Sequence, residues 1–367
     1  MQRAQLDHIL HQILEDAPEA SDIIFTVNKP TQVEVHGELR NARMEPNPGP
    51  LLPIQVEAIA MCMMGNRLRL YEDQVLRGSC DLSYELPGFC RFRVNILGQR
   101  GSLAIVMRRL TSAVPTIGEL ELPDVFYEMS REKFGLILIT GATGTGKTTS
   151  LAALIDNINQ LYRKHIVTLE DPIEYVHEHK LGTINQRELG RDFDAFASGL
   201  RAALRQAPKV ILVGEIRDRE TVSIALEAAE TGHLVLGTLH TSDAGQTINR
   251  IIGMFELAEE RLIRDRLAGS LKFVISQRLM PRIGGGRIPA FEIMKTNLRV
   301  REVIFNGETE EKNFYNIVES GDAFGMITFD KYLANLFENN IITEETAILN
   351  SSDRSRLARL VDRKSVV

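Results

Sequence analysis

FGLILITGATGTGKTTSLAALIDNINQLY, residues 134–162, decides the fold of this 367-residue chain. The apolar run FGLILIT at 134–140 is typical of a buried strand, and TSLAALIDNINQLY at 149–162 has the apolar spacing of a helix. Between them, GATGTGKT at 141–148 matches the pattern G-x-x-x-x-G-K-[ST]. A strand, a glycine-rich loop and a helix in this order predict a phosphate-binding loop.

The loop combines small residues with one cation and one hydroxyl at the positions that a nucleoside triphosphate requires. Its glycines allow backbone N–H groups to turn inward around phosphates, and the positive end of the following helix adds to the attraction. We expect Lys147 to reach the β- and γ-phosphates of ATP, and Thr148 to ligate Mg²⁺. The predicted nucleotide-binding residues are Gly141, Thr143, Gly144, Thr145, Gly146, Lys147, Thr148 and Thr149.

Three more apolar runs follow the loop, and helical stretches separate them. They are HIVTLE at 165–170, KVILVGE at 209–215 and HLVLGTLH at 233–240. Continuous apolar runs of this kind indicate a parallel sheet that is buried on both faces. The fold class that this pattern predicts is α/β.

Acidic residues stand at the ends of two of these strands. The carboxyl ends of parallel strands line the ligand crevice, so Glu215 is the first candidate to position or deprotonate the attacking water. An ordinary surface glutamate at a strand end is the alternative. Glu170 is the favoured residue to hold Mg²⁺ through water or to polarise the nucleophile, whereas Asp171 and Glu174 are open alternatives with possible structural roles.

Two histidines, His233 and His240, flank the third strand. A neutral imidazole beside a nucleotide can sense the γ-phosphate or bridge to a neighbouring element. Spacing alone leaves a structural or surface role open for both histidines.

Composition excludes several classes of protein. Apolar residues make up 44% and charged residues 25% of the chain, and the net charge is -6. This acidic balance and the lack of tryptophan argue against a nucleic-acid translocase. The longest apolar stretch, at 134–142, is far shorter than the ~20 residues of a membrane span, so we expect no direct membrane insertion. Three sparse cysteines, without a C-x-x-C pair, fit a reducing cytosol and no structural zinc.

The pattern of elements divides the chain. Residues 1–110 read as a small α+β domain, and 111–124 as a linker. Residues 125–367 form the nucleotide-binding domain, which we expect to be mostly helical from about residue 255.

Four segments in order resemble the secretion-superfamily ATPases and, within them, the type IV pilus retraction ATPases of the PilT/PilU family. GATGTGKTTSLAALID is similar to the Walker A block and VTLEDPIEYVH to the Asp box, while LRQAPKVILVGEIRD resembles the Walker B signature and AAETGHLVLGTLHTSDA the His box. Weaker likeness extends to ASDIIF, VEVHGELR and FRVNILGQRGSLAIVMRRL. GATGTGKT and LRQAP look more like PilU and HLVLGTLHT more like PilT, so the paralogue stays open.

The resemblance implies a PAS-like N-terminal domain followed by a RecA-like P-loop ATPase domain, assembled as a homo-hexamer with nucleotide between the domains. It implies that arginines of the first domain reach the phosphate. The matching positions are Arg91 and Arg93 in CRFRVN and Arg108 and Arg109 in IVMRRL, of which Arg93 and Arg108 are the candidates for catalysis. A surface position on a strand is the alternative for each. It also implies that His233 and His240 correspond to the functional histidines of the family.

The function implied is an ATP-hydrolysing motor for pilus retraction and twitching motility. It would work at the cytoplasmic side of the inner membrane, on a pilus platform protein. Assembly ATPases of the superfamily carry a long extra N-terminal region and a four-cysteine zinc module after the Walker A block. Here the small domain begins near residue 1, and no cysteine follows Cys90. The alternatives are an assembly or type II secretion ATPase, and a PilU-like accessory ATPase that depends on a paralogue.

Overall fold

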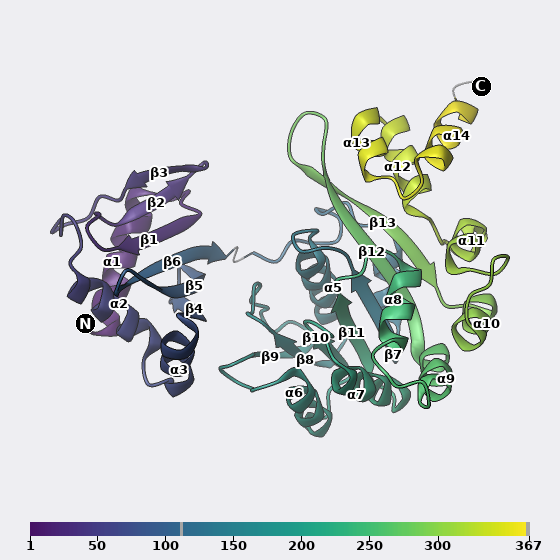
Figure 1. Cartoon of the computed structure of the whole chain (residues 1–367), viewed down its shortest axis with the longest axis horizontal. Coiled ribbons are helices and arrows are strands. Elements are labelled where there is room, and N and C mark those ends of the chain that lie inside the picture. Colours follow the sequence, from purple (N-terminus) through teal and green to yellow (C-terminus); the bar gives the residue numbers. More distant parts are fainter. Residues whose placement is uncertain (111–112, 365–367) are drawn as a thin grey trace. The chain divides into compact units, whose positions relative to one another are not determined.

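The computed structural model describes residues 1–110 and 113–364 (Figure 1). The chain divides into two compact units, Met1–Ala113 with Pro172–Val176, and Val114–Asp171 with His177–Val367. Residues 111 and 112 of the predicted linker lie outside the described residues. The rest of that predicted linker is not free chain throughout, because Ile117 and Leu122 are buried in the core of the second unit.

The first unit is an antiparallel six-stranded sheet with helices packed on it. Its strands pair in the order β3-β2-β1-β6-β5-β4. The apolar residues Leu6, Leu10, Ile13 and Leu14 of α1, at the start of the chain, are buried together in the core of this unit. The elements are α1 Arg3–Asp16, β1 Asp22–Thr26, β2 Gln32–Val35, β3 Glu38–Asn41, α2 Pro53–Met64, α3 Leu68–Arg77, β4 Ser79–Leu86, β5 Cys90–Gln99 and β6 Ser102–Leu110.

The second unit contains a seven-stranded sheet in the order β13-β12-β7-β11-β10-β8-β9. All neighbours are parallel except β12 and β13, so the predicted α/β class with a parallel sheet is confirmed. Its elements up to the last parallel strand are α4 Val125–Arg131, β7 Gly135–Thr140, α5 Lys147–Leu161, β8 His165–Glu170, β9 Thr183–Glu188, α6 Phe196–Ala203, β10 Val210–Val213, α7 Arg219–Glu230, β11 Leu234–Leu239, α8 Ala244–Ile252, α9 Glu260–Ser270 and β12 Leu271–Pro281. Next come β13 Arg287–Lys295, α10 Leu298–Asn306, α11 Phe314–Glu319, α12 Phe329–Glu338, α13 Glu344–Asn350 and α14 Arg354–Lys364.

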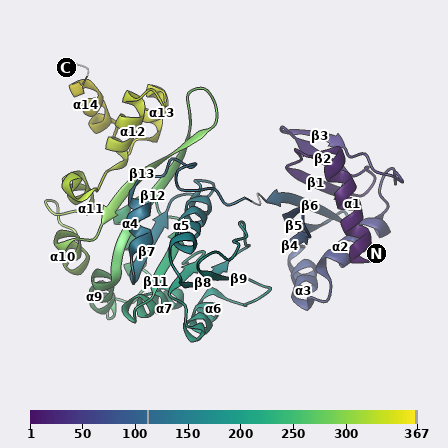
Figure 2. The same cartoon turned by 180° about the vertical axis from the view of Figure 1, so that it is seen from behind.

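Helices cover both faces of this sheet. Helices α4 and α5 lie on one face (Figure 2). Their side chains form one core with β7, β10 and β11. Helices α7, α8 and α9 lie on the opposite face (Figure 1). Their side chains form a second core with the same strands. Every residue of β7, β10 and β11 is therefore buried, as the continuous apolar runs of the sequence indicated.

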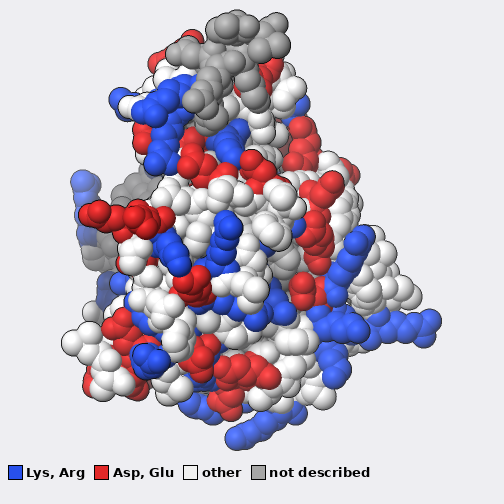
Figure 3. Space-filling view, turned by 90° about the vertical axis from the view of Figure 1, so that its right-hand side faces the viewer, with Lys and Arg blue, Asp and Glu red and all other residues white. Residues whose placement is uncertain are grey.

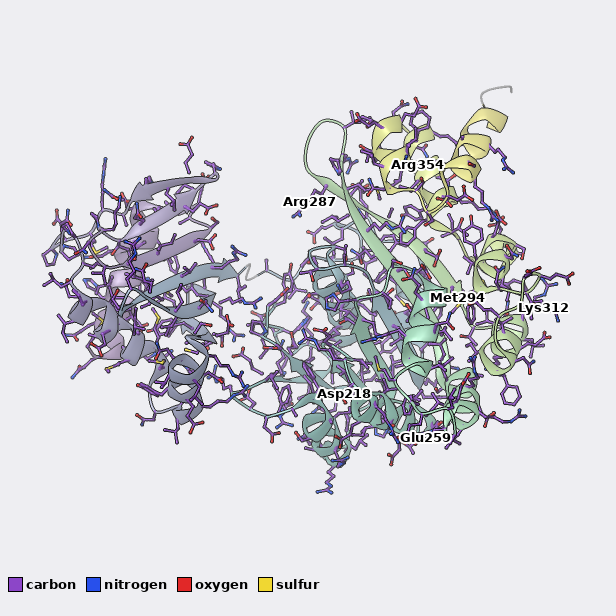
Figure 4. The ribbon with its side chains drawn as sticks, viewed as in Figure 1. Asp218, Glu259, Arg287, Met294, Lys312 and Arg354 are labelled. Carbon is purple, nitrogen blue, oxygen red and sulfur yellow. The ribbon has the colours of Figure 1, made fainter. Side chains whose placement is uncertain are left out.

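The prediction of a mostly helical chain from about residue 255 was wrong for residues 271–295. These residues form β12 and β13, joined by a turn in which Gly284, Gly285 and Gly286 all have positive φ angles. Arg287 marks the start of β13 in Figure 4. Seven of the eleven residues of β12 are buried, without period-2 alternation, because both faces of the sheet are covered. A buried strand of this kind cannot be told from a buried helix by periodicity.

Side chains of both charges are mixed on the surface. Lysine and arginine are interspersed with aspartate and glutamate on the face shown in Figure 3. Within the described part of the chain, none of the helices combines the length and the apolar character that crossing a bilayer would take.

Candidate active site

The P-loop follows β7 and holds its glycines in backbone conformations that other residues avoid. The φ angles of Gly141, Gly144 and Gly146 are 144°, 80° and 87°. A Cβ on Gly141 would lie 2.3 Å from the carbonyl oxygen of Gln277 in β12. The glycines are therefore required by backbone conformation at all three positions and, at Gly141, also by close packing.

Lys147 is the first residue of α5 and is buried. Its Nζ donates hydrogen bonds to the carbonyl oxygens of Gly141 at 2.7 Å and Ala142 at 2.9 Å. The Thr145 hydroxyl also donates to Ala142 O, at 2.9 Å. Thr143 and Gly144 are exposed at the tip of the loop, and Thr148 and Thr149 follow in the first turn of α5. The cation and the loop predicted to bind phosphate thus form one compact structure.

The order of the strands brings three predicted residues to the same edge of the sheet. β7, β11, β10 and β8 are successive parallel neighbours, and the P-loop, His240, Glu215 and Glu170 stand at or just beyond their carboxyl ends. Neighbouring strands lie about 4.8 Å apart. At Gly214, just after β10, a Cβ would lie 2.8 Å from Leu169 O, so the residue before Glu215 packs tightly against β8. The edge therefore combines the loop predicted to bind phosphate with the side chains of His240, Glu215 and Glu170.

Glu215 accepts hydrogen bonds from two cationic or potentially cationic groups. Its Oε1 lies 2.5 Å from Nε of Arg217 and 3.1 Å from Nε2 of His240. Partial burial raises the pKa of the Glu215 carboxyl, but the hydrogen bonds and charges of Arg217 and His240 outweigh burial and bring the pKa below its usual range. Glu215 is therefore a carboxylate at neutral pH.

Glu170 is buried at the end of β8 and is held by neighbouring polar groups. Its Oε1 accepts hydrogen bonds from the Thr168 hydroxyl at 2.6 Å and from Nε2 of Gln186 at 3.0 Å. The other end of the Gln186 amide accepts from the backbone N–H of His177 at 2.8 Å. Gln186 on β9 therefore links the Glu170 carboxylate to the loop after β8.

His233 is not brought to this edge within the chain. It precedes β11, and its Nδ1 lies 3.0 Å from Ala228 O. His240 follows the same six-residue strand, which spans about 20 Å. The two histidines that flank one strand in sequence consequently lie at opposite edges of the sheet, and only His240 contacts Glu215.

The predicted arginines belong to the first unit and form a cross-strand pair. Arg93 on β5 faces Arg108 on β6 in the antiparallel register. Nε of Arg108 donates to Asp22 Oδ1 at 3.0 Å, while both arginines are exposed. Arg91 and Arg109 also lie on these strands, where Arg91 donates to Ser83 Oγ and Arg109 to Pro18 O.

Asp171 and Glu174, the alternatives to Glu170, belong to different units. Asp171 is the last residue of its segment in the second unit, and Glu174 belongs to Pro172–Val176, which groups with the first. Asp218, labelled in Figure 4, has a structural role, because it caps α7 by accepting a hydrogen bond from Thr221 N at 2.8 Å.

Sequence reasoning missed the residues that hold the predicted ones in place. The sequence gives a weak indication of Arg217, because this residue lies two positions after Glu215. Nothing in the sequence indicates Gln186 or Gln277, because each contacts the site from a strand that is distant in sequence. Such contacts follow from strand order rather than from a local pattern.

Comparison with known proteins places these features in a family. The family model of the type II/IV secretion system protein matches residues 4–319. The chain is 42% identical to the type IV pilus retraction ATPase PilT of Pseudomonas aeruginosa PAO1, over 89% of this chain and 93% of PilT. It is 36% identical to the type IV pilus ATPase PilU of the same strain, over 93% and 87% of the two chains. A crystal structure of the pilus retraction motor PilT with bound ADP matches with a TM-score of 0.84 and 40% identity, over 98% of this chain and 99% of that chain.

Proposed function

Because this chain belongs to the type II/IV secretion system protein family and, within it, to the PilT/PilU ATPases, we propose that it hydrolyses ATP to drive retraction of type IV pili. The observation that carries the proposal is the alignment with the retraction ATPase PilT over nearly the whole of both chains. The P-loop and the carboxylates at the same sheet edge supply the chemistry that a motor of this kind needs.

The proposed reaction is hydrolysis of the bond between the β- and γ-phosphates. The P-loop N–H groups and Lys147 bind the phosphates and stabilise their charge. Glu215 positions the attacking water and accepts its proton, while Arg217 holds the carboxylate in place. His240 lies in strand order between the P-loop and Glu215, so it is suited to respond to the γ-phosphate.

The residues present fit Mg²⁺ as the cofactor. Mg²⁺ takes oxygen ligands and usually keeps several waters, so it needs one or two protein groups beside the phosphates rather than a cage of side chains. We assign its binding to the Thr148 hydroxyl, with the Glu170 carboxylate acting through water. The ion would neutralise charge on the phosphates.

We further propose that the first unit is PAS-like, that the second is RecA-like, and that the chain works as a homo-hexamer. Arg93 and Arg108 are exposed side by side on β5 and β6, which suits them to an anionic partner. In a ring of subunits they would act on the nucleotide of a neighbour, where a charge-stabilising arginine can be worth ~10³–10⁵ in rate.

The motor would act in the cytoplasm on an inner-membrane platform protein of the pilus. PilU supports a second candidate, an accessory retraction ATPase that works beside a paralogue, because its alignment also covers most of both chains. An assembly or type II secretion ATPase is the remaining alternative. The lack of cysteine after the P-loop argues against it, since the four-cysteine zinc module of the assembly ATPases cannot form there.

Deletion of the gene tests the proposal in the organism. The deletion strain should carry surface pili, counted by electron microscopy, and should fail to spread by twitching. The wild-type gene should restore twitching, whereas a Lys147→Ala gene should not. A strain without surface pili, restored by complementation, would assign the chain to pilus assembly instead. Normal twitching that is lost only on removal of a paralogue would indicate the accessory role.

A further inference from the structure

Gln277 on β12 is a buried amide whose two ends both contact the nucleotide-binding elements. The residue is 2% exposed. Its Nε2 donates to the carbonyl oxygen of Thr145 in the P-loop at 2.8 Å, and its Oε1 accepts from the Ser150 hydroxyl of α5 at 2.9 Å. Thr145 O can only accept, so it faces the NH₂ end of the amide, and the Ser150 hydroxyl holds the Oε1 end in place. The amide can therefore donate to the loop in one orientation only.

The hydrogen bond to Thr145 O fixes the direction of a group that faces the other way. In a planar trans peptide, the C=O of one residue and the N–H of the next point in opposite directions. Holding Thr145 O toward β12 consequently turns the N–H of Gly146 away from β12. Gly146 has a φ of 87°, in the left-handed region that glycine adopts readily, so without an anchor this peptide has freedom to rotate.

The backbone of Gln277 closes the same side of the loop. Its carbonyl oxygen lies where a Cβ on Gly141 would be 2.3 Å away, and its Nε2 lies 3.0 Å from the place of a Cβ on Gly146. The first and last glycines of the loop are thus packed against one residue. β12 therefore packs directly against one side of the P-loop.

We propose that Gln277 is a positioning residue for nucleotide binding, which orients the peptide between Thr145 and Gly146 so that its N–H is ready to bind a phosphate oxygen. The inference rests on the proposed function, since it concerns the same P-loop. An oriented loop binds more tightly than one that must be ordered on binding, because the cost of ordering is removed. Gln277 needs no contact with the nucleotide for this effect.

The test is the affinity of the full-length chain for ADP with Mg²⁺, measured by titration calorimetry. Gln277→Met keeps the length of the side chain and removes both hydrogen bonds. We expect its dissociation constant to rise about tenfold, the scale of one or two lost hydrogen bonds. Ser150→Ala removes only the bond that holds the Oε1 end of the amide, so a rise of roughly two- to threefold in the dissociation constant is expected.

The effects of the two substitutions on ADP affinity should not be additive. Once Gln277 is methionine, the Ser150 hydroxyl no longer orients an amide, so Ser150→Ala should have little further effect on ADP affinity in that background. Ile275→Val is the matched control, because Ile275 is fully buried in the same strand and pairs with Ile139 and Ile293 rather than with the loop. It should lower the melting temperature and leave ADP affinity unchanged.

Two results would overturn the assignment. One is ADP binding by Gln277→Met within twofold of wild type, and the other is an equal loss of affinity in Ile275→Val. If Gln277→Met does not fold, unchanged affinity in Ser150→Ala would overturn it, and the predicted rise would support it. Because the readout is ADP binding, it is separate from the motor function. A chain that binds ADP but fails to power retraction would contradict the proposed function and leave this test intact.

Discussion

His240 and Glu215 meet across the ends of two neighbouring parallel strands, with Nε2 of His240 3.1 Å from Oε1 of Glu215. Arg217 binds the same carboxylate oxygen. These two donors keep the pKa of Glu215 below its usual range against the opposing effect of burial. Glu215 is thus ionised and oriented at neutral pH, which is the state that a residue holding the attacking water requires.

Glu215→Gln should bind ATP and hydrolyse it poorly. The substitution keeps the size of the side chain and removes the carboxylate that accepts a proton, so the steady-state ATPase rate should fall by roughly 10²–10⁴-fold. Glu220→Gln is the matched control, since Glu220 on α7 is exposed and pairs with Arg201. Turnover by Glu215→Gln within about threefold of wild type would exclude Glu215 as the base and make Glu170 the next residue to test.

Lys147→Ala should weaken binding of ATP with Mg²⁺ by at least roughly tenfold, because charged hydrogen bonds to the phosphates are lost. Titration with a fluorescent ATP analogue measures the effect. Lys209→Ala provides the control, since Lys209 is exposed before β10, at the edge of the sheet away from the P-loop. Equal affinity of the Lys147 variant and the control would contradict the phosphate-binding role.

Arg93 and Arg108 should act in trans if the active sites are completed by oligomerisation. A chain carrying Arg93→Ala and Arg108→Ala, mixed with a Lys147→Ala chain, should recover part of the ATPase activity that each lacks alone. Arg69→Ala with Arg77→Ala is the control pair, since both arginines lie on α3 and bind Asp73 of the same helix. This control should be active without mixing. No recovery in proven mixed oligomers would contradict action in trans.

Glu292 predicts a dependence of stability on pH. The carboxyl accepts a hydrogen bond from Ala244 N at 2.9 Å in the interior of the second unit. Burial, together with nearby Asp243 and Asp330, outweighs the opposing effects of the Ala244 N–H and Arg278 and raises the pKa of Glu292 to about 7. The folded state therefore keeps a proton that the unfolded state has already lost.

The direction in which stability changes with pH follows from this difference between the pKa of Glu292 in the folded and in the unfolded chain. Between pH ~4.3, the ordinary pKa of glutamate, and about 7, the folded chain binds more protons than the unfolded chain, so stability falls as pH rises. The full effect is about 3.5 kcal/mol. Glu292→Gln keeps an acceptor for Ala244 N and removes the titration. Urea unfolding at pH 5, 6, 7 and 8 should show a weaker loss of stability in the variant. Identical slopes in both proteins would contradict the assignment to Glu292.

The sequence alone determined the P-loop and the parallel sheet that carries it. The glycines of residues 141–146, Lys147 and the apolar runs are local signals, because backbone conformation and burial on both faces act on consecutive residues. The same signals placed Glu215 and Glu170 at strand ends, and strands that run parallel share an edge. Their position at one edge of the sheet could therefore be predicted, whereas the order of the strands was needed to show that β8 and β10 are neighbours.

Only the tertiary structure decided which residues support that edge. It separated His233 from His240 by the length of β11, and it replaced an expected helical stretch by β12 and β13. It also brought Gln277 against the P-loop, although the two lie more than a hundred residues apart. Periodicity cannot distinguish a strand buried on both faces from a buried helix, and hydrogen bonds between distant strands depend on sheet order, which no local pattern encodes.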